Sequence, residues 1–578
     1  MNKSKQNEFR FLSQEKRSNS GRFLGGLTVF LVLSLPVLLI GRTLLTTFAA
    51  SPQGNTAASS SHNVTVDFGS RQNHGHPIPS QFLGIGGIDM SIALGNNGGK
   101  YVPQAGFHFA KMGDHDYMSE IFPTLASMAN PSQQNWTRLD QQLTLAKQYN
   151  LQPMITLAYT PSWLQPQNQT PRQTNACLTY SPPITAANVK PMFLVNGQDS
   201  GTHLWGKLAA LIVAHVDQQF PQAHSLYEIW NQPDGNTFLC MPKGDKNGDA
   251  DRVTAYKAIY AAAAPLMRAQ ASKDGTHVKI GGPALVYALQ SHLQMWLPAL
   301  LNDPAIYPYV DFISYHRYLY GKTFSGGGTS LVGNAQDSLL GVTAEYEQVA
   351  RAVRAGKQPN AARTPIYVDE YNMNPCEPHV CRNDPTYSPL DNGLFVVDYL
   401  NAVNDTKSPY GAAGAVPAGL AYYTWFTPLG NLCMFGVVDQ KMDCGKQGSP
   451  LQPYPQYYAY ELLGGANYLN ITNGGYVAGA ASTNQPGVYA AGFYTRTQDN
   501  VVIVNTTSAA IHTFTVLAQN AGKVSVAKAT IYTVKVNLGN PAKSITTQQV
   551  TLTKGQNGYT ATVDLPAFTM IGISFAAQ

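Results

Sequence analysis

The stretch "LYEIWNQPDG" (226–235) decides the fold expected of this chain, because it has the form of a buried strand that ends in polar residues. Seven other short apolar segments resemble it, at 81–87, 107–114, 152–160, 278–285, 311–318, 365–372 and 419–426. Longer stretches between them, such as 136–150, 204–220 and 254–272, repeat apolar residues at spacings of three and four, as amphipathic helices do. Eight strands that alternate with helices predict an α/β fold, a (β/α)8 TIM barrel.

The C-terminal part of the chain, residues 466–578, has a different pattern. Its segments 487–497, 500–507, 511–518, 526–534 and 558–565 are rich in Val, Thr and Tyr, and they alternate with a period of two. We expect a small antiparallel β-sandwich there, after a barrel domain at 63–465. Residues 62–70 alternate in the same way and are a candidate strand of that sandwich.

The length and composition allow two folded units and exclude one class of partner. With 578 residues, of which 44% are hydrophobic and 10% aromatic, the chain can bury a large core. The formal net charge of +5 lies entirely in residues 1–42, which carry seven Lys and Arg against two Glu. Since the remainder is neutral, nucleic acid is not an expected partner, because sequence-independent binding to phosphate needs clustered Lys and Arg.

The N-terminal region has the pattern of a membrane-targeting segment. A basic head at 1–22 precedes the uncharged apolar run 23–41, which is long enough to cross about 30 Å of hydrocarbon as a helix. The flanking charges predict a cytoplasmic head and an extracytoplasmic location for the rest of the chain. Small residues at 46–51 would suit a signal peptidase, so a membrane anchor and a cleaved signal both remain open. Residues 42–62 have the composition of a flexible linker.

The cysteines agree with an oxidising compartment. They are Cys177, Cys240, Cys376, Cys381, Cys433 and Cys444. Proximity in sequence favours the pairs 376–381 and 433–444, with 177–240 left over, although fifteen connectivities are possible. The zinc spacings CxxC and HxxxH are missing. Residues 245–252 resemble part of a calcium loop but lack its distal glutamate. We therefore expect no metal and no cofactor.

Polar residues at the ends of the expected strands are the candidates for chemistry, because TIM-barrel active sites are built from the loops that follow the strands. These residues are Asn231, Gln232, His316, Tyr318, Asp369, Glu370, Asn372 and Trp425. On a regular strand Asp369 would point away from Glu370, toward the helices. An amide, a carboxylate and an aromatic side chain at three different strand ends should converge on one site.

With these motifs the chain resembles the clan A glycoside hydrolases, nearest to family 39 with its xylosidase-like and iduronidase-like members. "YEIWNQPDG" matches the family's E-x-W-N-E-P motif except at Gln232, and "PIYVDEYN" matches the segment that carries the nucleophile. The resemblance implies a carbohydrate substrate, with Glu370 as the nucleophile and Asn231 binding a sugar hydroxyl. It also implies that His316 or Tyr318 orients the nucleophile, and that Trp425 and Trp163 line the sugar site.

Gln232 stands where the family has its acid/base glutamate. An amide can keep the shape and form hydrogen bonds, but it cannot transfer a proton, a function worth about 10² to 10⁴ in rate. Glu228, four residues earlier on the same face, is expected to be buried and structural. Asp234, in the following loop, is either a turn residue or a displaced acid.

Three hypotheses stay open on this basis. The first is an exported retaining glycosidase or transglycosidase that uses Glu370, on substrates whose leaving group needs little protonation or on a donor that brings its own base. The second is an inactive carbohydrate-binding protein. The third is an enzyme that uses Asp234 as its acid, which would be an inverting one because of the wider separation of the carboxyl groups. The sequence does not define the sugar or the oligomeric state.

Overall fold

A computed structural model describes residues 62–577 of the chain, apart from gaps at 71–74, 88–97, 113–116, 165–200, 236–237, 240–247, 287–289, 320–340, 374–387, 424–434, 437–451, 454, 480, 523 and 535–544. Residues 62–578 belong to one compact unit. The expected leader and all six cysteines lie outside the described residues.

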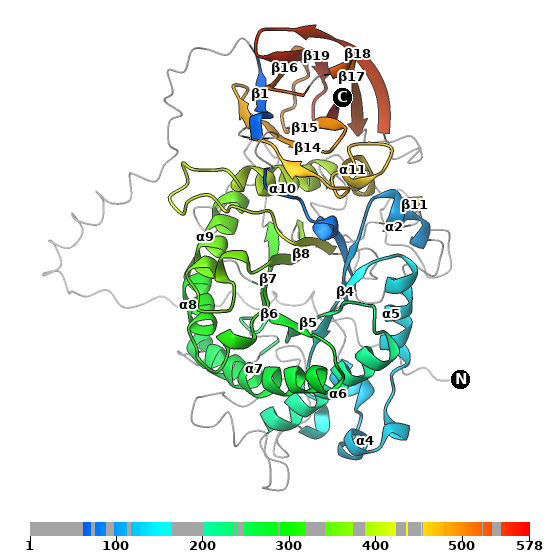
Figure 1. Ribbon diagram of the computed structural model, residues 1–578, viewed down its shortest axis with the longest axis vertical. Helices are drawn as coiled ribbons and strands as arrows, with labels where there is room; N and C mark the ends of the chain where they lie inside the picture. Colours follow the sequence, from blue (N-terminus) through cyan, green and yellow to red (C-terminus); the bar gives the residue numbers. More distant parts are fainter. Residues whose placement is uncertain are drawn as a thin grey trace, which may run out of the picture. The chain divides into compact units, whose positions relative to one another are not determined.

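Eight parallel strands close into a barrel, in chain order (Figure 1). They are β2 (Leu83–Gly87), β3 (Phe109–Met112), β4 (Gln152–Leu157), β5 (Leu226–Ile229), β6 (Lys279–Leu285), β7 (Phe312–Leu319), β8 (Ile366–Met373) and β9 (Gly419–Tyr423). Each falls within one residue of a segment that the sequence predicts. The prediction of a TIM barrel is therefore confirmed.

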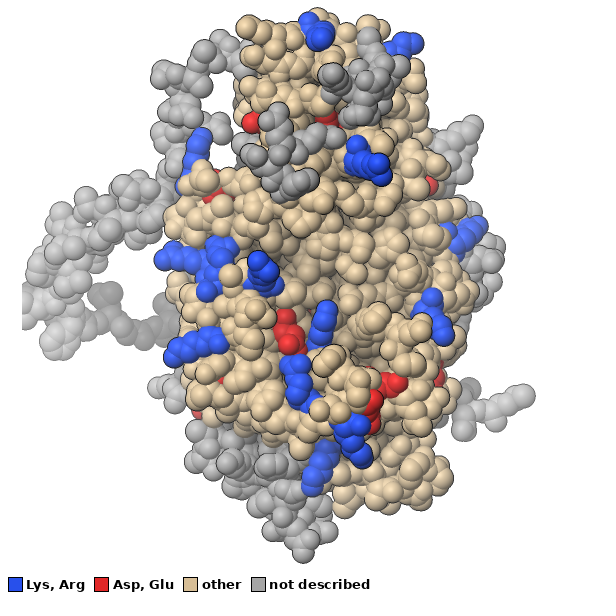
Figure 2. Space-filling model, viewed as in Figure 1, with Lys and Arg blue, Asp and Glu red and all other residues tan. Residues whose placement is uncertain are grey.

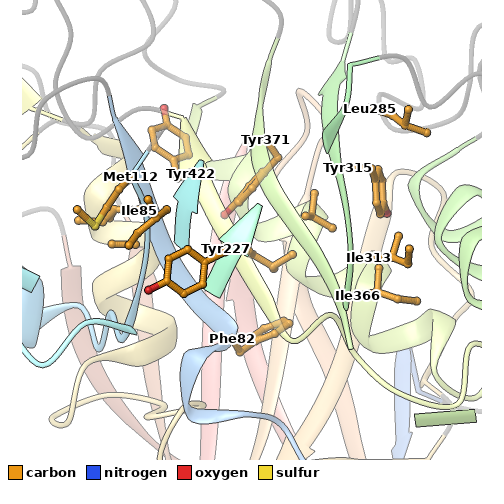
Figure 3. Packing of buried hydrophobic residues seen from close by; sticks show 14 of the residues in the cluster. Phe82, Ile85, Met112, Tyr227, Leu285, Ile313, Tyr315, Ile366, Tyr371 and Tyr422 are labelled. Atoms are coloured by element: carbon orange, nitrogen blue, oxygen red, sulfur yellow. The ribbon is translucent and has the colours of Figure 1, made fainter. Parts of the chain in front are cut away.

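Helices cover the outside of the barrel, as the apolar spacing of their sequences requires. The longer ones are α5 (Thr137–Gln148), α6 (Gly201–Gln219), α7 (Gly248–Lys273), α8 (Gln290–Leu301), α9 (Val342–Arg354), α10 (Ser388–Ala402) and α11 (Pro455–Gly464). The short ones are α2 (Tyr101–Gln104), α3 (Tyr117–Ile121) and α4 (Leu125–Ala129). Outward-facing strand residues pack against the helices, and Figure 3 shows several of them, including Ile313 and Tyr315 of β7 beside Ile366 of β8.

The inward-facing side chains form two layers that follow from the period of two along each strand. The lower layer is a separate apolar cluster. It consists of Phe109, Met154, Leu226, Phe312, Tyr367 and Ala421. Glycines on the intervening strands make room for these rings, because a Cβ at Gly84 or Gly419 would meet Phe109 and one at Gly281 would meet Phe312.

The upper layer lies two residues further along the same strands and is polar. Its members are Lys111, Thr156, Glu228, Ser314 and Asp369, and each is at most 1% exposed. Two residues beyond the apolar layer, the same strands thus carry a buried cluster of polar and charged side chains toward their C-terminal ends.

The C-terminal region forms one curled, mostly antiparallel sheet of ten strands, in the order β12-β14-β15-β20-β17-β18-β19-β16-β1-β13. The strands are β1 (Val64–Asp67), β12 (Tyr476–Val477), β13 (Ala481–Thr483), β14 (Val488–Tyr494), β15 (Gln498–Asn505), β16 (Ile511–Gln519), β17 (Val524–Val534), β18 (Ile545–Lys554), β19 (Gly558–Leu565) and β20 (Thr569–Ala577). The two-residue strands β10 (Phe435–Gly436) and β11 (Gln452–Pro453) do not belong to this sheet and pair with each other. β1, the candidate strand at 62–70, pairs in parallel with β16 and antiparallel with β13.

The curl of the sheet encloses its own apolar core, to which Val66, Ile503, Phe514 and Phe575 contribute from different strands. Contacts with the barrel run through α10 and α11. The Asn401 side chain donates to the Ala490 carbonyl at 3.0 Å, and a Cβ on Gly393 would meet Val504 and Met570. The sheet thus packs on barrel helices α10 and α11.

Candidate active site

Lys111, near the end of β3, is the centre of the polar layer. Its Nζ lies 3.0 Å from Glu370 Oε1, 2.6 Å from Asp369 Oδ2 and 3.3 Å from Glu228 Oε2. It also donates to Asn231 Oδ1 at 3.1 Å. One ammonium group therefore compensates three buried carboxyl groups, an arrangement that holds their side chains in fixed positions because an unpaired buried charge is costly. Lys111 is not among the residues that the sequence pattern singles out.

Glu228 on β5 is completely buried and lies beneath the site. Ser314 donates to its Oε1 at 2.6 Å, and Thr156 donates to its Oε2 at 3.0 Å. Burial, together with the nearby Asp369 carboxylate, raises the pKa of Glu228 to about 7. The expectation of a buried residue is confirmed, and Lys111 connects its carboxyl group to that of Glu370.

Asp369 does not point toward the helices, so the prediction for this residue was wrong. Its Oδ2 contacts Lys111 and lies 3.3 Å from His316 Nε2, inside the barrel. The cause is an irregularity in β8: Tyr315 pairs with Val368, and the next residue, His316, pairs with Glu370. The extra residue of this bulge lets Asp369 and Glu370 both face inward, which strict alternation would forbid.

His316 on β7 connects the amide and the carboxylate that the sequence singles out. Its Nδ1 lies 2.8 Å from the Gln232 side-chain amide and 3.1 Å from Glu370 Oε2. Its Nε2 lies 2.9 Å from Lys111 Nζ. Burial lowers the pKa of His316 to about 4, so the ring is neutral at neutral pH. Gln232 and Glu370 are thus brought together as the strand pattern predicts.

The chain is bent sharply where β5 ends. Trp230 and Gln232 have φ angles of 69° and 50°, in the left-handed region that non-glycine residues rarely adopt. The Gln232 N–H donates to the Ala284 carbonyl, and the Gly235 N–H donates to the Gln232 carbonyl. Such conformations cost about 1–3 kcal/mol and persist where the surrounding structure fixes them. This turn directs Asn231 and Gln232 toward the polar layer.

Asn231 is held from two sides. Its Oδ1 accepts from Lys111, and its Nδ2 donates to the Tyr159 hydroxyl at 3.2 Å. Tyr159 follows β4, so three strands contribute to this small network. Neither Lys111 nor Tyr159 belonged to the predicted site. The sequence signal for Lys111 was a lysine inside the largely apolar segment 107–114.

Asp234 lies in the loop after Gln232 but is 2% exposed. Its Oδ1 accepts from the Val286 N–H at 2.8 Å, and its Oδ2 lies 3.3 Å from His292 Nδ1 on α8. The hydrogen bond to Asp234 raises the pKa of His292. These contacts tie the loop to the segment after β6, as expected of a residue that stabilises a turn.

The other predicted site residues are less informative. The Trp163 indole N–H donates to the Phe122 carbonyl at 2.7 Å, and the ring packs against the core. The backbone of Tyr318 pairs with Asn372 in the barrel, but its side chain lies outside the described residues, as does Trp425.

Neither a metal site nor a membrane span is found within the described ranges. They contain no group of three His, Cys, Asp or Glu side chains arranged to hold a metal ion. Among the helices of these ranges, none has the length and apolar character needed to cross a membrane. The apolar run 23–41 lies outside them, so the prediction of a targeting segment stays a prediction.

Fold and site define the class as a (β/α)8 barrel with acidic residues at the ends of its strands. The model of glycosyl hydrolases family 39 matches residues 105–414, more than half of the chain, and the chain belongs to this family. A comparison with curated proteins finds no match.

Solved structures share the fold at low sequence identity. A family 39 enzyme from Xanthomonas axonopodis pv. citri has 15% identity and a TM-score of 0.56, over 91% of this chain and 100% of that one. The family 30 xylanase Xyn30A from Clostridium acetobutylicum has 12% and 0.52, over 89% and 100%. The family 51 α-L-arabinofuranosidase AbfB from Bifidobacterium longum has 13% and 0.53, over the same shares. These similarities extend across the barrel and the C-terminal sheet.

Proposed function

We propose that the protein is an exported retaining glycosidase or transglycosidase in which Glu370 is the nucleophile and Gln232 occupies the acid/base position. One observation carries the proposal: the Gln232 amide and Glu370 Oε2 both lie within hydrogen-bond distance of His316 Nδ1. These two groups are therefore no more than about 6 Å apart, compatible with the separation of about 5 to 5.5 Å between the paired groups of retaining enzymes.

The contacts of Glu370 suit a nucleophile. Lys111 and His316 hold one carboxylate oxygen each, which fixes the orientation of the group and favours its anionic form. In this proposal Glu370 attacks the anomeric carbon and forms a glycosyl ester, which an acceptor then displaces with a second inversion. His316 and Lys111 position the carboxylate, and Asn231 binds the hydroxyl next to the anomeric carbon.

A carbohydrate-binding protein without activity is the second candidate. The amide at position 232 favours it, because general acid–base assistance is missing there. The variant Gln232→Glu separates the two. If the variant hydrolyses glycosides and the parent only binds them, the parent is a degenerate enzyme. The displaced-acid hypothesis has less support, because both oxygens of Asp234 are engaged.

Trapping of the intermediate tests the proposal. Incubation with 2,4-dinitrophenyl glycosides of xylose, arabinofuranose and glucose, followed by intact-mass measurement, should reveal one added glycosyl group. The Glu370→Gln variant should lack this adduct. The control variant Glu461→Gln changes a glutamate on helix α11 instead of one at a strand end, and it should retain the adduct. Absence of an adduct with every sugar in both the parent and Gln232→Glu would contradict the proposal.

Export is a separate part of the proposal and rests on the leader sequence alone. Fractionation of cells that express the full chain should find the protein in the membrane or outside the cell. Recovery in the cytoplasm would remove this part without affecting the chemistry.

A further inference from the structure

We infer that Gln232 donates an N–H group to a leaving group that departs as an oxyanion, so that the substrates are glycosyl esters, glycosyl phosphates or aryl glycosides rather than ordinary sugar–sugar linkages. The inference rests on the proposed retaining reaction and adds the chemical class of the substrate. It follows from the hydrogen-bond network around His316, which determines how the amide of Gln232 is turned.

The two nitrogens of His316 have different partners. Lys111 Nζ, 2.9 Å from Nε2, can only donate, so Nε2 accepts. Asp369 Oδ2 is 3.3 Å from the same nitrogen but 2.6 Å from Nζ, so its partner is the charged lysine, with which it forms an ion pair, rather than the neutral ring. A neutral ring then carries its proton on Nδ1, which donates toward Glu370 Oε2 at 3.1 Å.

This tautomer fixes the orientation of the neighbouring amide. The atom of Gln232 that faces Nδ1 at 2.8 Å occupies the position of Nε2, but a donor cannot face a donor. Amide oxygen and nitrogen are assigned from their partners, and here the partner requires the oxygen. With Oε1 sharing the single Nδ1–H of His316 with Glu370 Oε2, the NH2 group is turned away from the ring and can donate to a substrate.

Other carboxyl groups of the network are not free to supply the missing proton. Glu228 and Asp369 are completely buried and paired with Lys111. Asp234 is held by the Val286 N–H and His292. Gln232 can therefore donate a hydrogen bond to the leaving oxygen but cannot protonate it. This suits a leaving group that is stable as an anion far better than an alkoxide, which is too basic to depart without a proton.

The reaction balances without an added reagent. Glu370 attacks the anomeric carbon, the bond to the leaving oxygen breaks, and the electron pair departs with that oxygen, which the amide stabilises. In the second step an acceptor attacks the anomeric carbon and the ester electron pair returns to Glu370. Water as acceptor releases its proton to solvent, whereas an anion needs no base. Because the amide is neutral, it does not repel such an anion as a carboxylate would.

A leaving-group series tests the inference. We take aryl glycosides of the sugar that labels Glu370, with phenols whose pKa extends downward from about 10, and measure kcat/KM. The parent rate should fall steeply as the phenol pKa rises, and Gln232→Glu should flatten this dependence. Gln232→Met, which keeps the size but removes the donor, should lose about 10²- to 10³-fold on the most acidic phenol. Added azide should accelerate turnover of the parent and yield a glycosyl azide.

The outcomes separate this inference from the proposed function. An adduct on Glu370 with a flat leaving-group dependence in the parent, or with full activity in Gln232→Met, would overturn the inference and leave the retaining mechanism standing. No adduct in either the parent or Gln232→Glu would overturn both.

Discussion

The two inward-facing layers of the barrel are built on the same strands, two residues apart, and follow opposite rules. The lower layer closes the barrel with aromatic and aliphatic side chains such as Phe312 and Tyr367, whose rings are 5.4 Å apart. The upper layer, with Lys111 at its centre, buries charges instead. In the first, shape decides which residues fit, because apolar contacts have no fixed direction. In the second, charge balance decides, because each unpaired group would be costly.

The largest expected effect is on the chemistry at Gln232, which contacts the upper layer through His316. Gln232→Glu should raise the hydrolysis of alkyl glycosides by about 10²- to 10⁴-fold, the usual contribution of a general acid. Initial rates with a methyl glycoside and with a disaccharide measure it. Gln232→Met is the control and should show no gain. If both variants behave like the parent, the position does not face a leaving group.

Loss of the central charge should be the next largest effect. Lys111→Met leaves three buried carboxyl groups without their cation and should lower the free energy of unfolding by about 3–5 kcal/mol. The loss should be smaller at pH 5 than at pH 8, because burial raises the pKa of Glu228 to about 7 and this group is then protonated and uncharged at pH 5. Denaturant titrations at both pH values provide the measurement. Lys257→Met, which breaks a more exposed pair with Asp303, should cost no more than about 1 kcal/mol.

A change in the lower layer should affect stability through steric packing alone. Gly281→Ala places a methyl group against the ring of Phe312 and should destabilise the protein by about 1–3 kcal/mol. The same denaturant titrations should give equal losses at pH 5 and pH 8. A pH-dependent loss here would show that the two layers are not independent. Gly275→Ala is unsuitable as a control because its φ is 72°, whereas a Cβ at Gly555 would meet only the Gly558 carbonyl oxygen, at an ordinary contact distance of 3.8 Å.

The smallest expected effect is a change in the pH dependence of stability. Between pH 4.5 and about 7 an unfolded Glu228 is ionised while the folded one keeps its proton, so the free energy of unfolding falls as pH rises through this range. Glu228→Gln should remove this contribution. Burial also raises the pKa of Glu345 to about 8 and that of Asp398 to about 7, so the difference between the variant and the parent is the quantity to measure. Identical pH profiles would contradict the assignment.

The barrel could be predicted because its signal is repeated. Eight apolar segments with polar ends, separated by amphipathic helices, leave few alternatives. In the C-terminal sheet β18 escaped prediction because its residues are largely exposed and polar, so the alternation is weak. β20, which is also missing from the predicted segments, is in contrast well buried where its side chains are described.

The site was only partly predictable, for reasons of geometry. Glu370 and Gln232 follow from strand-end position and motif. Asp369 faces inward against the prediction because a bulge breaks the strand alternation, and no residue type marks that bulge. Lys111 was overlooked because its strand reads as apolar, and its meaning depends on three carboxyl groups contributed by strands more than a hundred residues away.

The anomer first released from an activated glycoside tests the central claim most directly, namely that Gln232 and Glu370 face each other across the anomeric carbon. Proton NMR during the first minutes of hydrolysis distinguishes the two anomers before they equilibrate. Retention of configuration is predicted, because Glu370 forms a covalent intermediate. Inversion would contradict the account and would point to a water-mediated reaction between more widely separated groups.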